Sequence, residues 1–132
     1  MANEAVCIET PTEFARYTIA DATSVPIGTI MKLTDPHLVV VSSADNDPFA
    51  GIAWEEKTTG DGITEITVAK NGLWDMVCTA AAITVGAIVN VGGANLIVAS
   101  AAADLLTGSV VGKAEETSTT TETMRIRVGR VV

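Results

Sequence analysis

The sequence predicts an all-β protein: a small single-domain β-barrel or β-sandwich, with an internally duplicated hairpin unit and an extended N-terminal arm. Three observations lead to this prediction. Short stretches alternate apolar and polar side chains, turns rich in Gly, Pro, Asn and Asp separate them, and one stretch occurs twice. The pattern indicates about ten short strands and no long helix. We expect residues 1–13 to form the arm and residues 14–132 a single β domain.

The stretch from Ile83 to Ser100 shows the pattern most clearly. Its odd positions from 83 to 91 are all apolar, which predicts one strand with a single buried face. Gly92 and Gly93 follow, and glycine readily takes the positive φ of a tight turn. We therefore expect a hairpin that turns at these glycines and returns through residues 96–98.

A second copy of this unit lies fifty-eight residues upstream. Residues 28–44 and 86–102 share six of seventeen positions, where unrelated segments share about one or two. The similarity continues with an offset larger by two or three residues, pairing Gly51-Ile-Ala with Gly112-Lys-Ala and Glu65-Ile-Thr-Val with Arg125-Ile-Arg-Val. We interpret this as a duplicated β unit; chance similarity in a low-complexity chain is the alternative.

Other segments complete the prediction. Residues 14–20 are expected to form the first strand of the body, and residues 99–106 either one helical turn or a loop. Asn71-Gly72 is a strong hairpin dipeptide, so residues 73–79 should fold back on the strand before it.

Composition limits the function. The chain has 132 residues, a net charge of -8 and a pI near 4.4, which argues against nucleic-acid binding because phosphates require clustered Lys and Arg. No apolar run is long enough to span a membrane, and the opening Met1-Ala-Asn-Glu has no basic leader, so we expect synthesis in the cytoplasm. Cys7 and Cys78 are expected to be reduced, although a bridge between them is possible.

Catalytic and metal-binding residues are poorly represented. His37 is the single histidine and falls in a predicted turn. The pairs Glu55-Glu56 and Glu115-Glu116 occupy equivalent places in the two copies and are better explained as solvated strand ends than as the acids of a glycosidase. Asp45-Asn46-Asp47 fits an Asx turn better than a calcium loop. We therefore predict no enzyme activity, no metal and no cofactor.

Residues that contact other proteins are predicted from exposure and residue type. Val6, Ile8, Pro11 and Phe14 are candidates for contact through the arm, because an extended segment can pair with another chain's sheet edge. Candidates for a subunit interface are the two tryptophans, which otherwise pack in the core, and two arginines of the final strand: Trp54, Trp74, Arg125 and Arg127.

The order of glycines and β segments resembles that of the capsid cement, or head decoration, proteins of tailed bacteriophages. The resemblance covers about residues 14 to 130 and is carried by these segments: Val25-Pro-Ile-Gly-Thr-Ile-Met-Lys-Leu, Gly51-Ile-Ala, Ile66-Thr-Val-Ala-Lys-Asn-Gly, Ile83-Thr-Val-Gly-Ala-Ile-Val, Gly112-Lys-Ala and the closing Arg-Ile-Arg-Val. It implies a compact β-barrel-like or β-tulip-like body that forms a trimer on the outer surface of an expanded capsid, where it contacts the major capsid protein. It also implies an N-terminal arm that joins this contact.

We therefore expect a structural virion protein, made in the host cytoplasm, that stabilises a capsid. Two alternatives stay open: a virion-surface carbohydrate-binding module, and a small hydrolase that uses the paired glutamates.

Overall fold

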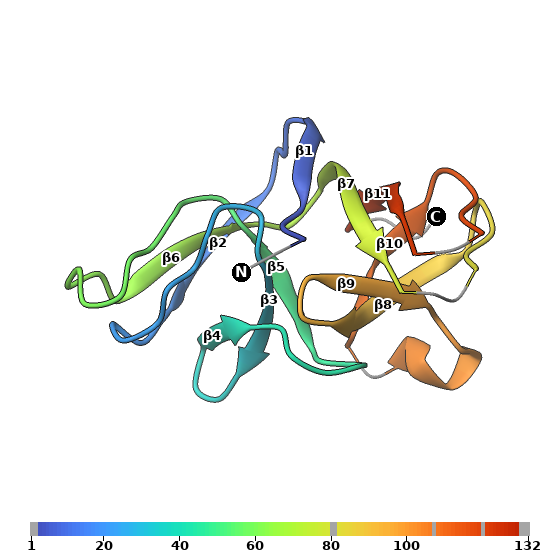
Figure 1. Ribbon diagram of the computed structural model, residues 1–132. Coiled ribbons are helices and arrows are strands. Elements are labelled where there is room, and N and C mark those ends of the chain that lie inside the picture. The colour runs from blue at the N-terminus through green and yellow to red at the C-terminus, as the bar shows by residue number, and fades with distance from the viewer. Residues whose placement is uncertain (1–2, 80–81, 107, 120, 130–132) are drawn as a thin grey trace.

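The computed structural model describes residues 3–79, 82–106, 108–119 and 121–129, and confirms the all-β prediction (Figure 1). One 3₁₀ turn, Ala102–Leu106, settles the alternatives for residues 99–106 in favour of a helical turn. The strands are β1 Val6–Glu9, β2 Phe14–Thr18, β3 Ile30–Thr34, β4 Leu38–Val41, β5 Phe49–Ala53, β6 Glu65–Ala69, β7 Gly72–Cys78, β8 Ile88–Gly93, β9 Leu96–Ala99, β10 Val110–Ala114 and β11 Thr123–Val128.

The strands form two barrels side by side. Barrel 1 closes in the order β2-β4-β3-β5-β6. Barrel 2 has the corresponding order β7-β9-β8-β10-β11, because β7 pairs with both β9 and β11, and β1 is added to the outside of β7. In Figure 1 barrel 1 occupies the blue-to-green side and barrel 2 the yellow-to-red side.

The barrels share one topology, which confirms the duplication. Each has a single parallel pair, joined at Thr18 and Leu38 in barrel 1 and at Val77 and Leu96 in barrel 2, and its other strand pairs are antiparallel. The isolated bridge between Val25 and Lys57 also has a counterpart, between Ile83 and Ser118. Strands β3, β4, β5 and β6 therefore correspond to β8, β9, β10 and β11, as the sequence predicts, and β2 corresponds to β7, which sequence similarity does not reveal.

The ladders correct the alignment of the last strand pair. Ala53 pairs with Val68, and the equivalent Ala114 pairs with Ile126. Val68 therefore corresponds to Ile126, whereas the sequence alignment placed it with Val128. A shift of two residues keeps every side chain on its original face, so alternation of apolar residues cannot detect it.

The predicted hairpin at residues 83–98 is wrong in two details. The chain turns at Gly86, with φ 89°, so Val85 is 57% exposed and β8 starts only at Ile88. Gly93 belongs to β8 beside a bulge, and the turn falls at Ala94 and Asn95 instead. Asn95 takes the left-handed conformation, with φ 56°, which asparagine tolerates better than most residues.

Asn71-Gly72 is not a hairpin turn. Strand β7 pairs with β1, β9 and β11, so the dipeptide connects the two barrels. The Asn71 side chain holds this connection, because its Oδ1 accepts the N–H groups of Thr12 at 2.8 Å and Glu13 at 3.1 Å. A preferred dipeptide marks a sharp change of direction without specifying which strand follows.

The core consists mainly of aliphatic side chains, in two clusters. One lies within barrel 1, and the other extends from barrel 2 across the junction to include Ile30, Ile52 and Ala69 of barrel 1. Ala5 of the N-terminal segment is 6% exposed and belongs to the second cluster. The arm is therefore extended, as predicted, but its strand lies along the β7 edge of its own chain.

Candidate interaction surface

Three aromatic side chains run from the surface into the core. Phe14 of β2 is 43% exposed, and its ring centroid lies 5.4 Å from that of Trp54, which follows β5 and is 37% exposed. Trp54 in turn meets Trp74 of β7 edge-on at 6.1 Å. Trp74 is 1% exposed, and its Nε1 donates to the carbonyl of Asn71 at 3.0 Å. Phe14 and Trp54 are thus a surface pair held from below by a buried ring.

The structure separates the two predicted tryptophan candidates. Trp54 has surface that another protein can cover, whereas Trp74 packs in the core of its own chain. The prediction of Trp74 as an interface residue is corrected on this ground, because a side chain with almost no accessible area cannot contact a second subunit directly.

The predicted arm residues also differ from one another in their exposure to solvent. Val6 is 59% and Ile8 41% exposed, whereas Cys7 between them packs against the core. This is the alternation of a strand with one face on the protein and one face outward. Pro11 is buried, so it supports the fold rather than offering a contact.

The two predicted arginines make ion pairs within the chain. Arg127 lies 2.9 Å from a carboxylate oxygen of Glu9 and 3.1 Å from one of Glu115, which fastens β1 to β10 and β11. Hydrogen bonding and charge from Arg127 hold the pKa of Glu9 below its ordinary value. Arg125 lies 3.4 Å from Asp75. Both arginines keep exposed surface, and their role in an interface stays a prediction.

The paired glutamates have the same structural task in both barrels. Glu55 Oε1 accepts the N–H of Thr67, and Glu116 Oε1 accepts the N–H of Arg125, each at 2.9 Å. Thr67 and Arg125 are equivalent in the corrected register. One carboxylate of each pair therefore caps the adjacent strand, which explains the repeat without catalysis.

The remaining predicted residues are also engaged in the fold. His37 lies in a turn, with Nε2 3.1 Å from the carbonyl of Arg16 and its ring 4.6 Å from that of Tyr17. Asp47 accepts the N–H groups of Ser43 and Ala44, which precede it, whereas the side chain of an Asx turn accepts the N–H two residues further on. Cys7 and Cys78 form no disulfide.

The described part of the chain has neither a cluster of metal-ligating side chains nor a membrane-spanning helix. Nowhere in it do three His, Cys, Asp or Glu side chains gather closely enough to hold a metal ion. No helix within the same ranges has the length and apolar character needed to cross a bilayer.

A cluster that sequence reasoning missed surrounds Lys57. Its side chain is 1% exposed, and its Nζ lies 2.9 Å from Asp61 and 3.4 Å from Asp21. Burial acts to lower the pKa of Lys57, but hydrogen bonds to Asp61 and Asp21 outweigh it, so the pKa is raised. The Lys57 hydrogen bond lowers the pKa of Asp61 to about 2. Gly60-Asp61-Gly62 marks the turn in the sequence, but the partner Asp21 is too distant there to be recognised.

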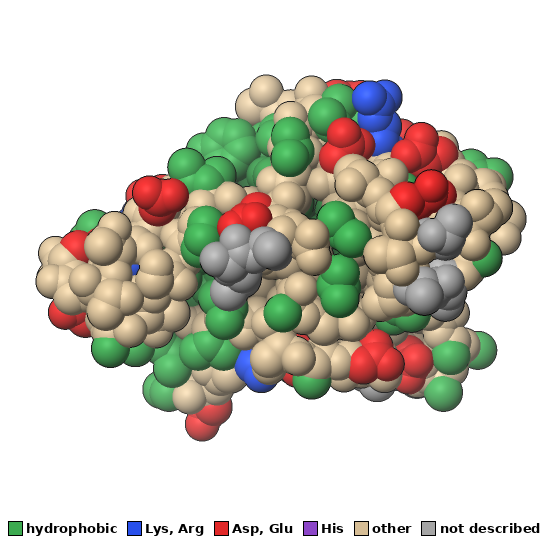
Figure 2. Space-filling model, viewed as in Figure 1, with side chains coloured by type: hydrophobic (Ala, Val, Ile, Leu, Met, Phe, Trp, Pro, Cys, Tyr) green, Lys and Arg blue, Asp and Glu red, His purple; other side chains and the backbone are tan. Residues whose placement is uncertain are grey.

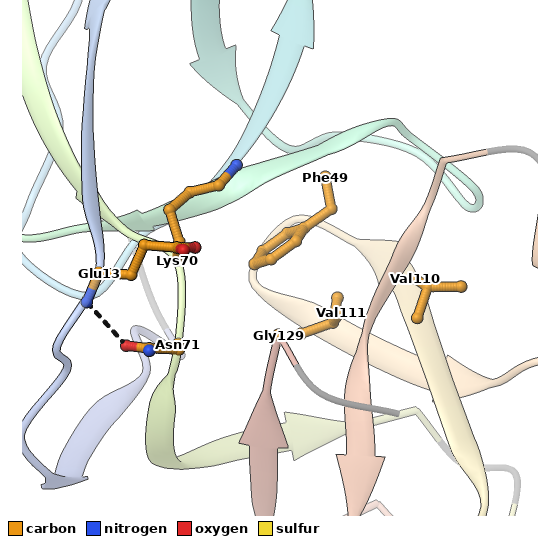
Figure 3. Close-up of a pocket in the computed structure, with 7 residues that line it drawn as sticks. All are labelled: Glu13, Phe49, Lys70, Asn71, Val110, Val111 and Gly129. Carbon is orange, nitrogen blue, oxygen red and sulfur yellow. Dashed lines mark hydrogen bonds between the residues drawn. The ribbon is translucent and has the colours of Figure 1, made fainter. Parts of the chain in front are cut away.

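A hollow of about 450 Å³ lies where the barrels meet, lined by Glu13, Phe49, Lys70, Asn71, Val110, Val111 and Gly129 (Figure 3). The one basic side chain of this lining, Lys70, is already engaged in the fold. Its Nζ donates to the carbonyl of Ala50 at 2.7 Å and lies 3.3 Å from the Tyr17 hydroxyl. The lining offers neither a nucleophile with an adjacent base nor a carboxylate pair. We therefore place the candidate site on the exposed apolar surface.

That surface adjoins the N-terminal strand. In the view of Figure 2, hydrophobic side chains gather beside β1 and above β2 and β6, while acidic groups are scattered over both barrels. Backbone hydrogen bonds join three segments at this surface. The N–H of Ala5 donates to the carbonyl of Gly28, and the N–H of Gly28 donates to the carbonyl of Ala53. Their sequence neighbours Val6, Ile27 and Trp54 are all exposed.

No protein-family model matches the chain, and no curated protein matches it. Among solved structures, the chain is similar in fold to the N base of the head fiber protein gp8.5 of bacteriophage phi29, with a TM-score of 0.54 and 17% identity. The match covers 88% of this chain and 94% of that one. At this identity the match establishes a shared fold, the double barrel, over almost the full length of both chains.

Proposed function

We propose that this protein is a structural component of a phage virion that binds the outside of the expanded head and stabilises it. It acts as a trimer across boundaries between subunits of the major capsid protein, and it reaches the head after synthesis in the host cytoplasm. The observation that carries this proposal is the fold shared with the base of a phage head fiber, a protein attached to the head. The order of β segments resembles that of capsid decoration proteins, which adds support from the sequence.

The exposed apolar residues supply the contact in this proposal. Val6 and Ile8 on the outer face of β1, with the pair Phe14 and Trp54, offer accessible apolar area on a well-packed base. A trimer presents this surface three times, so modest contacts combine through effective concentration. The role requires no catalytic step and no cofactor.

Co-sedimentation with empty heads tests the proposal. The purified protein is titrated onto expanded heads, with unexpanded heads as control. We expect saturable binding to expanded heads alone, at a fixed ratio to capsid subunits, and a trimer in analytical ultracentrifugation. Absence of binding to both head forms would contradict the proposal for that capsid.

Substitutions then locate the contact. Val6→Lys and Trp54→Ala should weaken binding, whereas Val85→Lys, at an equally exposed turn of barrel 2, is the matched control. Deletion of residues 1–12 is unsuitable, because it removes buried Ala5 and the strand that covers β7.

The exposed aromatic pair favours carbohydrate binding as a second candidate, since aromatic rings stack on sugar faces. The rings of Phe14 and Trp54 are inclined by 56° and do not form one flat platform. Binding of the isolated protein to a glycan array, abolished by Trp54→Ala, would favour this candidate over attachment to the head.

A further inference from the structure

Strands β2 and β7 occupy the same position in the two barrels, but their outer edges are covered differently. Thr18 of β2 and Val77 of β7 each begin the parallel pair. Counting back along the ladders, Phe14 corresponds to Leu73 and Arg16 to Asp75. The duplication thus provides an internal reference for each edge.

In barrel 2 the edge is occupied. The N–H of Cys78 donates toward β11, to Glu122, so Leu73 and Asp75, which are odd-numbered, direct their backbone groups to the opposite side. There β1 runs antiparallel to β7, with Glu9 opposite Leu73 and Val6 opposite Asp75. Leu73 is only 5% exposed.

In barrel 1 no strand within the described ranges covers the same edge. The N–H of Ile19 donates toward β6, to Thr64, so Phe14, Arg16 and Thr18 direct their backbone groups outward. Thr18 is paired with β4, and its N–H donates to the carbonyl of His37. The His37 ring lies against the carbonyl of Arg16. Among the described residues, no strand pairs with Phe14 or Arg16 on this side.

The side chains show the same difference. Phe14 is 43% exposed where Leu73 is 5% exposed. The Arg16 side chain is 55% exposed, against 27% for Asp75, and its nearest carboxylate oxygens, on Glu55 and Glu65, lie 3.6 and 4.0 Å away. An exposed edge with unpaired donors is a template for an added strand.

We propose that the outer edge of β2 at Phe14–Arg16 binds an extended segment of a partner protein as an added antiparallel strand. The segment carries an acidic residue opposite Arg16 and, two residues later, an apolar residue opposite Phe14, next to Trp54. That the partner is a head-surface protein rests on the proposed function. Strand β1 shows that the equivalent edge of this fold accepts such a strand.

A second copy of this chain is a poorer occupant than a separate partner. Its own matching strand is β1, which is held by burial of Ala5, by packing of Cys7 and by the ion pair between Glu9 and Arg127. Swapping β1 between two copies would break all three of these contacts, whereas a free extended segment of a partner has no such contacts to lose.

A peptide experiment tests the edge itself. The probe is acetyl-Thr-Thr-Glu-Val-Ile-Thr-Lys-amide at millimolar concentration, and amide hydrogen exchange of the intact protein is followed by NMR. We expect the amides of Phe14 and Arg16 to exchange about tenfold more slowly with peptide, while those of Leu73 and Asp75, already covered by β1, stay unchanged. No slowing at Phe14 and Arg16, or a change confined to Leu73 and Asp75, would overturn the proposal.

Reversing the charge at Arg16 and on the peptide distinguishes loss of the contact from misfolding of the variant. The Arg16→Glu variant should bind the Glu-containing peptide more weakly than the natural chain does. It should bind the same peptide with Lys in place of Glu more tightly. If both peptides bind the variant and the natural chain equally, the assigned register is wrong.

Amide hydrogen exchange measured on head-bound protein tests the edge contact separately from the proposed function. Slowed exchange at residues 14–16 on expanded heads identifies the head as the partner. Binding to heads without slowing there contradicts the edge contact and leaves the proposed function standing. Peptide binding without head binding contradicts the proposed function and leaves the edge site standing.

Discussion

Asn95 and His37 occupy the same turn position in the two barrels, and only Asn95 is buried. Both take the left-handed conformation, with φ 56° and 54°. Asn95 is 0% exposed, its Oδ1 accepts the N–H of Ile30 at 2.8 Å, and its own N–H donates to Ser42 Oγ at 3.2 Å. His37 is exposed at the free end of barrel 1. The β8–β9 turn of barrel 2 is therefore fixed against barrel 1.

Replacement of Asn95 should destabilise the junction. Asn95→Gly keeps the backbone conformation but leaves the Ile30 N–H without its acceptor, which costs about 1–3 kcal/mol. Asn95→Ala adds about 1 kcal/mol for the left-handed backbone. His37→Gly is the matched control and should cost less than about 1 kcal/mol. Urea unfolding measures all three; equal losses at both positions would contradict the assigned role of Asn95.

The two barrels are expected to unfold together. Ile30, Ile52 and Ala69 of barrel 1 share a hydrophobic cluster with barrel 2, so opening either barrel exposes part of the other. The sequence likewise predicts a single domain over residues 14–132, and the same experiment tests that prediction. Calorimetry should show one transition whose calorimetric and van't Hoff enthalpies agree. Two resolved transitions would mean that the barrels are separate domains.

Gly28 and Gly86 provide a matched test of how the N-terminal segment docks. Both have positive φ, 92° and 89°, in equivalent turns. A Cβ on Gly28 would collide with the carbonyl oxygen of Ala5, whereas a Cβ on Gly86 meets open space. We expect Gly86→Ala to cost about 1–2 kcal/mol for strain alone, and Gly28→Ala to cost more. Thermal unfolding compares them, and equal costs would indicate that the Ala5 segment is readily displaced.

The parts of the fold that the sequence predicts are those that depend on local alternation. Strands β3, β4, β5 and β6 and their copies are recognisable because each repeats apolar spacing and glycine positions. The β2–β7 correspondence is hidden, because Ala15 in barrel 1 stands where barrel 2 has Trp74. The equivalent strands therefore fill different spaces.

The candidate surface is predictable only in part. Exposure of Val6 and Ile8 follows from their alternation with Cys7. Burial of Trp74 beneath Trp54 does not, because it depends on how the barrels meet. The open edge of β2 cannot be predicted from the sequence either. It is recognised because β1 covers the edge of β7, whereas no strand of the described residues covers the equivalent edge of β2.

The two tryptophans should respond differently to truncation. Trp74→Ala removes a fully buried ring and should cost about 3–5 kcal/mol of unfolding free energy. Trp54→Ala removes a ring that is 37% exposed and should cost about 1–2 kcal/mol. Denaturant unfolding gives both values. A larger loss at Trp54 would contradict the arrangement of surface ring over core ring.

The Lys57 cluster should make stability depend on pH in the acid range. Bonding to Lys57 lowers the pKa of Asp61 to about 2 from an ordinary value of 3.8. A carboxyl group whose pKa is lower in the folded state binds fewer protons there than in the unfolded chain between these values. Its stabilisation is therefore fully present above pH 3.8 and is lost as the pH falls through about 2.

Asp61→Asn should remove this contribution. We expect the free energy of unfolding of the variant to fall less steeply than that of the natural chain between pH 4 and pH 2, as measured by urea titrations across that range. Lys57→Met removes the partner, so adding Asp61→Asn to it should change the slope less than Asp61→Asn does in the natural chain. If Asp61→Asn flattens the profile equally with and without Lys57, backbone hydrogen bonds from Thr58 and Ile63, rather than the buried ammonium group, hold the carboxylate ionised.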